Sequence, residues 1–193
     1  METKLIEIMN KNEGVLTTKD ATAAGIPRIY ITKLVRKGII ERVRAGVYLN
    51  SEAFGDEFYL FQLRYPKAIF SHNTALYFYN MTERTPSHIE ITVLRGYNAH
   101  RFPDNYLVYY ITKKKFDLGI TSMQSPQGRT VKCTDLERTL CDIIRNNKSL
   151  DLETRNKSIK EILRSGKLDE KKLSSYAKIL RCSKQLNMIR EIL

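Results

Sequence analysis

The chain has 193 residues, of which 42% are hydrophobic and 28% charged, and it contains no long Gly, Ser or Pro run. This composition excludes a largely disordered protein and favours about two packed domains. The formal net charge of +12 favours encounter with nucleic acid, although many basic proteins bind nothing acidic. Lys and Arg concentrate near both ends, with nine against five acidic residues over 1–50 and thirteen against six over 145–193.

Two helices are predicted at the start of the chain. Apolar residues at helical spacing predict the first helix from about Thr3 to Asn12. A second, short helix begins at Thr17 or Thr18, whose hydroxyl can cap exposed backbone amides, and it stops at Gly25. Its small side chains allow another helix to cross it closely.

A third helix follows the Gly25 break, with Pro27 as its first residue and Gly38 at its end. Three apolar residues at helical spacing form its inward stripe: Ile31, Leu34 and Val35. The outward faces are therefore basic, aromatic and hydrogen-bonding. This order of elements is typical of a helix-turn-helix.

A β-hairpin is predicted next, with strands at 39–43 and 46–49 around a tight turn. Arg42 and Arg44 would lie near its tip, within reach of phosphates or the minor groove when the third helix occupies the major groove. We therefore predict a winged helix-turn-helix DNA-binding domain at residues 1–50. The alternatives are a solvated basic face and a winged helix that binds protein.

Six side chains are the predicted DNA-binding residues: Arg28, Tyr30, Lys33, Arg36, Arg42 and Arg44. Arg28 and Tyr30 lie nearest the amino end of the third helix and are candidates for contacts to base edges. The other four are candidates for phosphate contacts. Replacement of a base-reading residue should relax sequence preference rather than weaken all binding uniformly.

Residues 51–193 predict a larger mixed α/β domain that ends in helices, so the expected fold class is α+β. From Phe54, aromatic-rich sequence predicts two helices separated near Tyr65 and Pro66. Ser71 or Asn73 can cap the second of these helices. The segments HIEITVL and YLVYYITK predict two strands, and a third strand is expected near 128–133.

The last part of the chain predicts helices. Thr134 can cap a helix from Asp135 to Asn146, with Glu137 at capping-box distance. Further amphipathic segments are marked by three groups of residues at helical spacing: Ile159, Ile162 and Leu163; Leu173, Tyr176, Ala177 and Leu180; Leu186, Ile189 and Leu193. The domain at 51–193 therefore ends in helices.

The three cysteines, Cys133, Cys141 and Cys182, lack the CxxC spacing of a zinc or redox motif, so we expect reduced and mostly buried thiols. The first residues, METKLIEIMN, lack the apolar core of a signal peptide, and no later window reaches membrane-spanning length. We therefore expect a cytoplasmic protein that does not contact a membrane.

No pattern of catalytic residues is found. The three histidines lie in different predicted elements without metal-ligand spacing, and Ser71 beside His72 is better explained as a helix cap than as a nucleophile. Asp104 follows Pro103 in a predicted turn without the paired acid and lysine of a nuclease. We expect no catalytic residue, no metal, no cofactor and no enzyme activity; a DNA-cleaving nuclease is the enzymatic alternative.

Four segments together resemble the AbiEi family of antitoxins: VLTTKDATAAGIPRIYITKLVRKGIIERVRAGVYL, FSHNTALYFYNMTERTP, HIEITV and CTDLERTLCDII. The resemblance implies a type IV toxin-antitoxin system that acts in abortive phage infection. It implies an autorepressor that binds double-stranded DNA at inverted repeats in its own promoter. It also implies neutralisation of a nucleotidyltransferase-like toxin without a stable complex, and is compatible with a monomer that binds DNA cooperatively. The alternative is a regulator without an antitoxin role.

The basic helices near the carboxyl terminus have two interpretations. Eight cations could form a second surface for polyanions: Lys157, Lys160, Arg164, Lys167, Lys171, Lys172, Lys178 and Lys184. They could equally be the solvated charges that any amphipathic helix carries. If the surface matters, deletion of 150–193 should leave promoter recognition intact and abolish neutralisation of the toxin.

Overall fold

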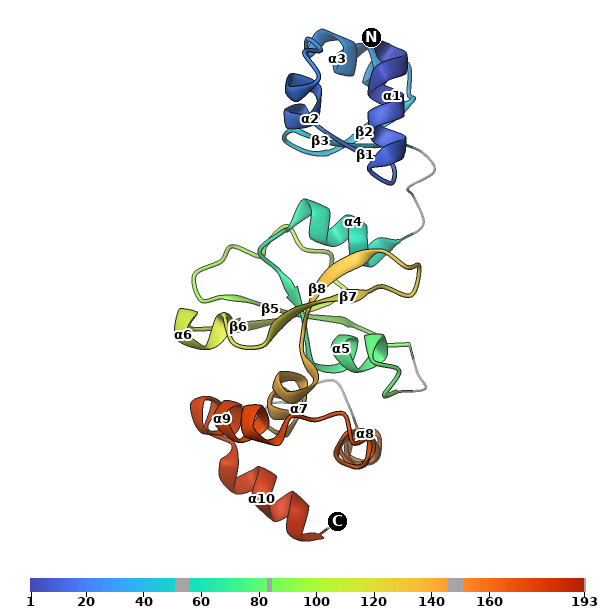
Figure 1. The fold of residues 1–193 in the computed structure, drawn as a ribbon. Coiled ribbons are helices and arrows are strands. Elements are labelled where there is room, and N and C mark those ends of the chain that lie inside the picture. The colour runs from blue at the N-terminus through green and yellow to red at the C-terminus, as the bar shows by residue number, and fades with distance from the viewer. Residues whose placement is uncertain (51–55, 83–84, 146–150, 193) are drawn as a thin grey trace. The chain divides into compact units, whose positions relative to one another are not determined.

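The computed structural model describes residues 1–50, 56–82, 85–145 and 151–192. The chain divides into two compact units, which we call unit 1 (residues 1–66 and 125–129) and unit 2 (67–124 and 130–193). Helices and strands occur in both units (Figure 1), which confirms the α+β class. Within the described ranges, no helix is long and apolar enough to cross a membrane.

Unit 1 begins with three helices, α1 (Glu2–Lys11), α2 (Thr18–Ala23) and α3 (Ile29–Arg36). All three were predicted, but α3 begins two residues later than expected. The Pro27 carbonyl accepts the Tyr30 amide at 3.1 Å and closes a three-residue turn ahead of the helix. The first α-helical bond runs from the Thr32 amide to the Arg28 carbonyl, also at 3.1 Å.

A capping box fixes the start of α2. The Thr17 hydroxyl oxygen accepts the Asp20 amide at 3.1 Å, and the Asp20 carboxylate accepts the Thr17 amide at 2.8 Å. These bonds satisfy donors that a helix amino terminus would otherwise leave unpaired. Of the two caps considered, Thr17 is the one used.

A three-stranded antiparallel sheet completes this part of unit 1, in the order β1-β3-β2. Its strands are β1 (Val15–Thr17), β2 (Ile40–Arg44) and β3 (Val47–Asn50). The two strands of the expected hairpin are therefore present, each displaced by about one residue. Strand β1 was not predicted.

One hydrophobic cluster joins the three helices to the sheet. It contains Leu5, Met9, Leu16, Ala21, Ile26, Ile31, Leu34 and Ile40. Two of the three residues expected on the inner face of α3, Ile31 and Leu34, are fully buried, and Val35 is half-buried against the same cluster. Burial of this stripe fixes which face of α3 remains exposed.

Unit 1 extends beyond residue 50, where we had placed the domain boundary. Helix α4 (Glu57–Arg64) packs three side chains, Tyr59, Leu60 and Leu63, against a second apolar cluster of β1 and β3. That cluster consists of Val15, Val47 and Leu49. This contact buries apolar surface of β1 and β3, which explains why α4 belongs to unit 1. The helix start expected at Phe54 lies outside the described residues.

Unit 2 contains a five-stranded mixed sheet in the order β6-β5-β4-β8-β7. Its strands are β4 (Ile69–Phe70), β5 (Ile89–Leu94), β6 (Tyr106–Ile111), β7 (Ile120–Gln124) and β8 (Thr130–Thr134). Strand β4 is antiparallel to β5 and parallel to β8, β5 is parallel to β6, and β7 is antiparallel to β8. The three predicted strands are β5, β6 and β8.

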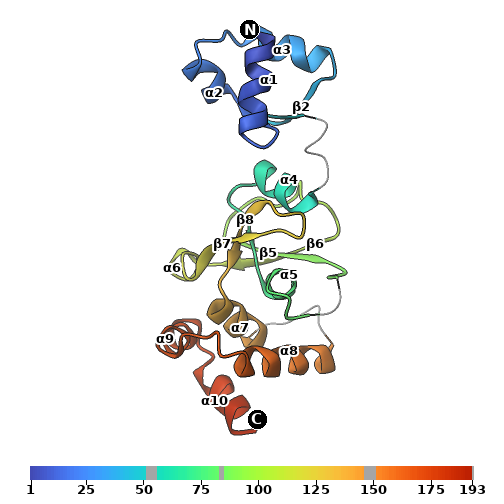
Figure 2. The same cartoon turned by 45° about the vertical axis from the view of Figure 1, so that its right-hand side comes forward.

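In the described residues of unit 2 the helices are α5 (His72–Phe78), α6 (Lys113–Phe116), α7 (Leu136–Arg145), α8 (Leu152–Arg164), α9 (Glu170–Leu180) and α10 (Ser183–Ile192). Helix α7 is the central one, because α5, α8, α9 and α10 all pack against it. Figure 2 shows these helices turned by 45°. The expected helix end at Asn146 and the apolar residue Leu193 lie outside the described residues.

The start of α7 differs from the prediction. The Asp135 carboxylate, rather than the Thr134 hydroxyl, accepts the Arg138 amide at 2.8 Å. Glu137 does not complete a capping box, because its carboxylate accepts the Asp169 amide at 2.9 Å and so joins α7 to the start of α9. The Thr134 hydroxyl instead lies 2.8 Å from that of Thr139.

Candidate nucleic-acid interface

One face of α3 is exposed and basic. Burial of Ile31 and Leu34 turns the opposite side of the helix to solvent, because successive residues are separated by about 100°. This surface, which we call the α3 face, consists of Arg28, Ile29, Thr32, Lys33 and Arg36. It combines three cations with one hydroxyl and one apolar side chain. Sequence reasoning missed Ile29, which is 54% exposed.

Tyr30 lies at the margin of the α3 face. It is half-buried and packs against the cluster that joins the three helices to the sheet. The Lys33 ammonium lies 5.2 Å from the centroid of its ring, a cation–π arrangement. The ring therefore stabilises the helix and orients Lys33, and only its outer part is accessible.

Lys37 points away from the α3 face. Its ammonium lies 2.6 Å from the Glu2 carboxylate at the start of α1. Hydrogen bonding to Lys37 lowers the pKa of Glu2 below its usual range. The Lys37 ammonium thus forms an ion pair with α1 inside unit 1.

The β2–β3 hairpin carries two further exposed arginines, Arg42 and Arg44. Arg42 pairs with Tyr48 and Arg44 with Val47, with a register shift between the two arginines. The turn is held against α2, because the Thr18 amide donates to the Gly46 carbonyl at 3.0 Å. The hairpin and α3 therefore belong to one compact scaffold.

The positive charges of this surface are not neutralised within unit 1. In the part of the chain that the structure describes, four guanidinium groups have no hydrogen bond or ion pair to another side chain: Arg28, Arg36, Arg42 and Arg44. Five of the six predicted contacts are thus exposed cations on α3 or the hairpin, and Tyr30 is the exception. Such a surface can accept phosphates without first breaking internal bonds.

Residues 5–51 match the family model for “Transcriptional regulator, AbiEi antitoxin”. The predicted resemblance is confirmed over this AbiEi region, which contains all six predicted contacts. The matched residues do not include the resembling segments between 70 and 144. The description of this family names transcriptional regulators and antitoxins. No curated protein matches the chain.

The histidines occupy different environments. His88 and His100 are exposed and lie 3.2 Å from the Ser87 hydroxyl and 2.5 Å from the Asn98 side chain, respectively. His72 is buried in unit 2, with Nδ1 2.9 Å from the Ser71 hydroxyl. Our interpretation of Ser71 as a capping side chain is therefore wrong, because its hydroxyl makes no cap bond to α5.

The cysteine prediction is confirmed, since Cys133, Cys141 and Cys182 are free and buried. Burial raises the pKa of the Cys133 thiol above its usual range. Within the described residues, no three His, Cys, Asp or Glu side chains are grouped so that they could hold a metal ion.

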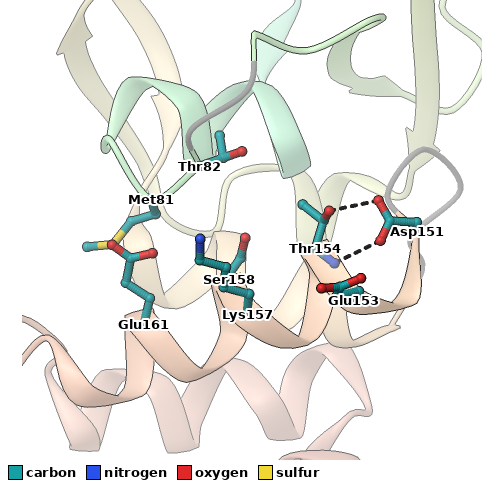
Figure 3. Close-up of a pocket in the computed structure, with 8 residues that line it drawn as sticks. All are labelled: Met81, Thr82, Asp151, Glu153, Thr154, Lys157, Ser158 and Glu161. Atoms are coloured by element: carbon teal, nitrogen blue, oxygen red, sulfur yellow. Dashed lines mark hydrogen bonds between the residues drawn. The ribbon is translucent and has the colours of Figure 1, made fainter.

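A pocket of about 290 Å³ beside α8 is lined mainly by charged and hydroxyl side chains (Figure 3). Several of the polar side chains in this lining stabilise α8 itself. The Asp151 carboxylate accepts the Thr154 amide at 2.9 Å and its hydroxyl at 2.7 Å, and so caps α8. The other carboxylates, Glu153 and Glu161, flank Lys157 on the same helix. We assign no ligand to this pocket.

Proposed function

We propose that this chain is a sequence-specific DNA-binding repressor that uses a winged helix-turn-helix. The observation that carries the proposal is the exposed α3 face together with two unpaired arginines on the adjacent hairpin. In this arrangement α3 enters the major groove, and the β2–β3 hairpin acts as the wing. Arg28 is the candidate for base edges, whereas Lys33, Arg36, Arg42 and Arg44 contact phosphates.

The proposed target is an inverted repeat in the promoter of the chain's own operon. The match of residues 5–51 to a family of antitoxin regulators supports autoregulation. We further propose that the chain counters a nucleotidyltransferase-like toxin of a type IV phage-defence system without a stable complex. In this proposal the chain has no catalytic role of its own.

Fluorescence anisotropy tests the DNA proposal directly. The full chain is titrated against its own upstream DNA and against a scrambled duplex, each at two salt concentrations. We expect tighter binding to the upstream DNA and a steep loss of affinity with salt. Equal, weak binding to both duplexes would refute autorepression, and binding of a protein partner without preference for duplex DNA would favour an interaction module.

Matched variants locate the interface. Arg36→Ala removes one proposed phosphate contact and should reduce the slope of log affinity against log salt by about 1. Lys11→Ala removes an equal charge from the end of α1 and should leave that slope close to the unmodified value. If both variants behave alike, only the net charge matters and the α3 face has no special role.

The antitoxin proposal needs a separate assay. Co-expression with the toxin encoded beside this chain should restore growth, and Arg36→Ala should still do so although it represses the promoter poorly. Growth arrest despite co-expression would refute the antitoxin role while leaving the DNA result intact. Metal-dependent loss of intact DNA in the binding assay would refute the non-catalytic proposal.

A further inference from the structure

Unit 2 contains a cavity of about 190 Å³ that plays no part in the proposed DNA interface. Its walls come from β5, β6, α5 and α7. The polar side chains that line it include His72, Thr92, Arg138, Asp142 and Arg145. It is smaller than most ligand pockets, so only a small group could enter it.

His72 places a hydrogen-bond donor in this cavity. The residue is 4% exposed, has a φ of 51°, and its ring stacks on that of Tyr109 with centroids 3.6 Å apart. The Thr92 hydroxyl donates to the Ser71 oxygen at 2.8 Å, so the Ser71 hydroxyl is free to donate to Nδ1 of His72. The neutral ring then carries its hydrogen on Nε2.

Nε2 of His72 has no partner among the residues that the structure describes. Burial lowers the pKa of His72, which keeps the ring neutral near pH 7. Nε2 is not sealed in the core, so it can donate to an acceptor that enters the cavity.

Arg138 supplies a second such donor. It is 1% exposed, and its Nε donates to Asp142 at 2.6 Å. Its Nη1 donates to the carbonyls of Lys115 and Leu118 at 2.6 and 3.0 Å. Its Nη2 has no hydrogen-bond partner within the described ranges. Two side chains more than nine-tenths buried thus line one cavity with an unpaired N–H each.

Arg145 adds a more accessible cation. Its side chain is 30% exposed, and its Nη1 lies 3.5 Å from the Asp142 carboxylate. The lining contains two guanidinium groups and one carboxylate, and a second carboxylate, Glu90, lies nearby and accepts the Tyr109 hydroxyl at 2.8 Å.

We propose that this cavity binds a phosphate group, as inorganic phosphate or as a small phosphomonoester. Three donors come from two helices: Nε2 of His72 from α5, and the guanidinium groups of Arg138 and Arg145 from α7. Guanidinium groups suit the several oxygens of phosphate, and Asp142 is already paired. This site is independent of the proposed DNA binding.

Nuclear magnetic resonance of the histidine rings provides the test. The chain contains only three histidines, and His88 and His100 are exposed internal references. The full chain, labelled with ¹⁵N-histidine and free of DNA, is titrated with inorganic phosphate and separately with adenosine 5′-monophosphate. Sodium chloride keeps the ionic strength constant. We expect a saturable shift of the His72 Nε2 signal that the two references do not share.

The two titrants distinguish the sources of the phosphate. A His72 response to both supports the site and shows that inorganic phosphate suffices. A response to the nucleotide alone supports it and identifies a phosphomonoester as the ligand. A His72 signal that stays unchanged with both, or shifts only in parallel with His88 and His100, would overturn the proposal.

A variant at the accessible arginine completes the test. Arg145→Ala should weaken phosphate binding at His72 about tenfold, the effect of losing one charge-assisted hydrogen bond. Arg164→Ala removes an exposed guanidinium from α8 that does not line this cavity and should leave the binding unchanged. Circular dichroism checks that both variants fold. Unaltered affinity in folded Arg145→Ala would also overturn the proposal.

Discussion

Ile29 is an apolar residue that is exposed on the basic face of α3. Its side chain is 54% exposed, yet it lies among Arg28, Thr32, Lys33 and Arg36 on the α3 face. A basic helix face built only for phosphates would need no apolar residue there. A methyl-bearing side chain on a helix in the major groove can contact the C5 methyl group of thymine. The proposed complex therefore explains why an apolar side chain, Ile29, lies on this face.

Replacement of Ile29 by Ala should weaken binding to the upstream DNA about fivefold, because about 1 kcal/mol of apolar contact is lost. Operator DNA in which uracil replaces thymine should weaken binding of the unmodified chain but not of Ile29→Ala. Anisotropy measures both effects. Ile39→Ala, at an exposed residue beyond α3, is the control. An unchanged response to uracil in the unmodified chain would contradict the thymine contact.

Protonation of His72 should limit stability at acidic pH. Burial lowers its pKa, so below the ordinary histidine pKa of about 6.5 the unfolded chain binds more protons than the folded chain. The free energy of unfolding should therefore fall as pH drops from 7.5 to 5.5, by at most about 1.4 kcal/mol per pH unit from this group.

The control is His72→Asn, because asparagine tolerates a positive φ and does not ionise. Urea denaturation in phosphate-free buffer should show a smaller loss of stability for this variant over the same pH range. Equal losses in the two proteins would assign the acid sensitivity to other groups.

At the scale of the elements, the sequence predicts those whose signals are local. The capping residues of α2, the inward stripe of α3 and the β2–β3 hairpin could be read from a few neighbouring residues. Strands β1 and β4 were missed because they have only three and two residues and depend on partners distant in the chain. The five residues of β7 alternate between exposed and half-buried, so they carry no apolar pattern.

In the candidate site, too, the features with local signals were predicted and those that depend on distant residues were missed. The periodicity of α3 correctly indicated the exposed cations. It did not place Tyr30 against the core or Ile29 outside it, because these positions depend on how α3 crosses α1 and α2. The cavity in unit 2 could not be predicted at all, since its residues come from β5, β6, α5 and α7.

Gly46 couples the hairpin to α2. It has a φ of 76°, and a Cβ atom there would lie 2.9 Å from the Thr18 hydroxyl oxygen. Gly38 has a similar φ of 69° but nothing within 4 Å of a Cβ position. Gly46→Ala should therefore destabilise the protein by at least about 1 kcal/mol more than Gly38→Ala, because it adds a steric clash to the same backbone strain.

Urea denaturation of the two glycine variants measures this difference. If Gly46 also sets the position of the hairpin, Gly46→Ala should bind DNA more weakly under conditions where the protein remains folded. Equal stability of the two variants would show that Thr18 moves aside at little cost.

At the scale of the whole molecule, the helices near the carboxyl terminus are structural as well as basic. Ile159, Ile162, Leu173, Leu180 and other residues of this region complete the hydrophobic cluster around α7. Lys172 also forms ion pairs with Asp135 at 2.9 Å and with Glu137 at 3.2 Å, so it is not a free surface charge. Deletion of 150–193 therefore removes core, and cannot isolate the role of the surface cations.

That deletion should unfold unit 2. Each of these four buried aliphatic side chains is worth about 2–5 kcal/mol when truncated, and their combined loss is as large as the total stability of a typical domain, which is about 5–15 kcal/mol. Deletion of 183–193 alone removes less of the core and should leave a folded but less stable unit. Limited proteolysis and circular dichroism distinguish the two truncations. A protease-resistant unit 2 after the longer deletion would contradict this expectation.

Because α7 is buried, we expect its backbone to open to solvent less often than that of the outer helices of unit 2. Nine of its ten residues are buried, and α5, α8, α9 and α10 pack against it. Its amide hydrogens should exchange with solvent only when unit 2 unfolds as a whole, whereas those of an outer helix such as α10 can exchange through local opening. Arg138, Asp142 and Arg145 should thus keep their spacing while outer parts of the unit fluctuate.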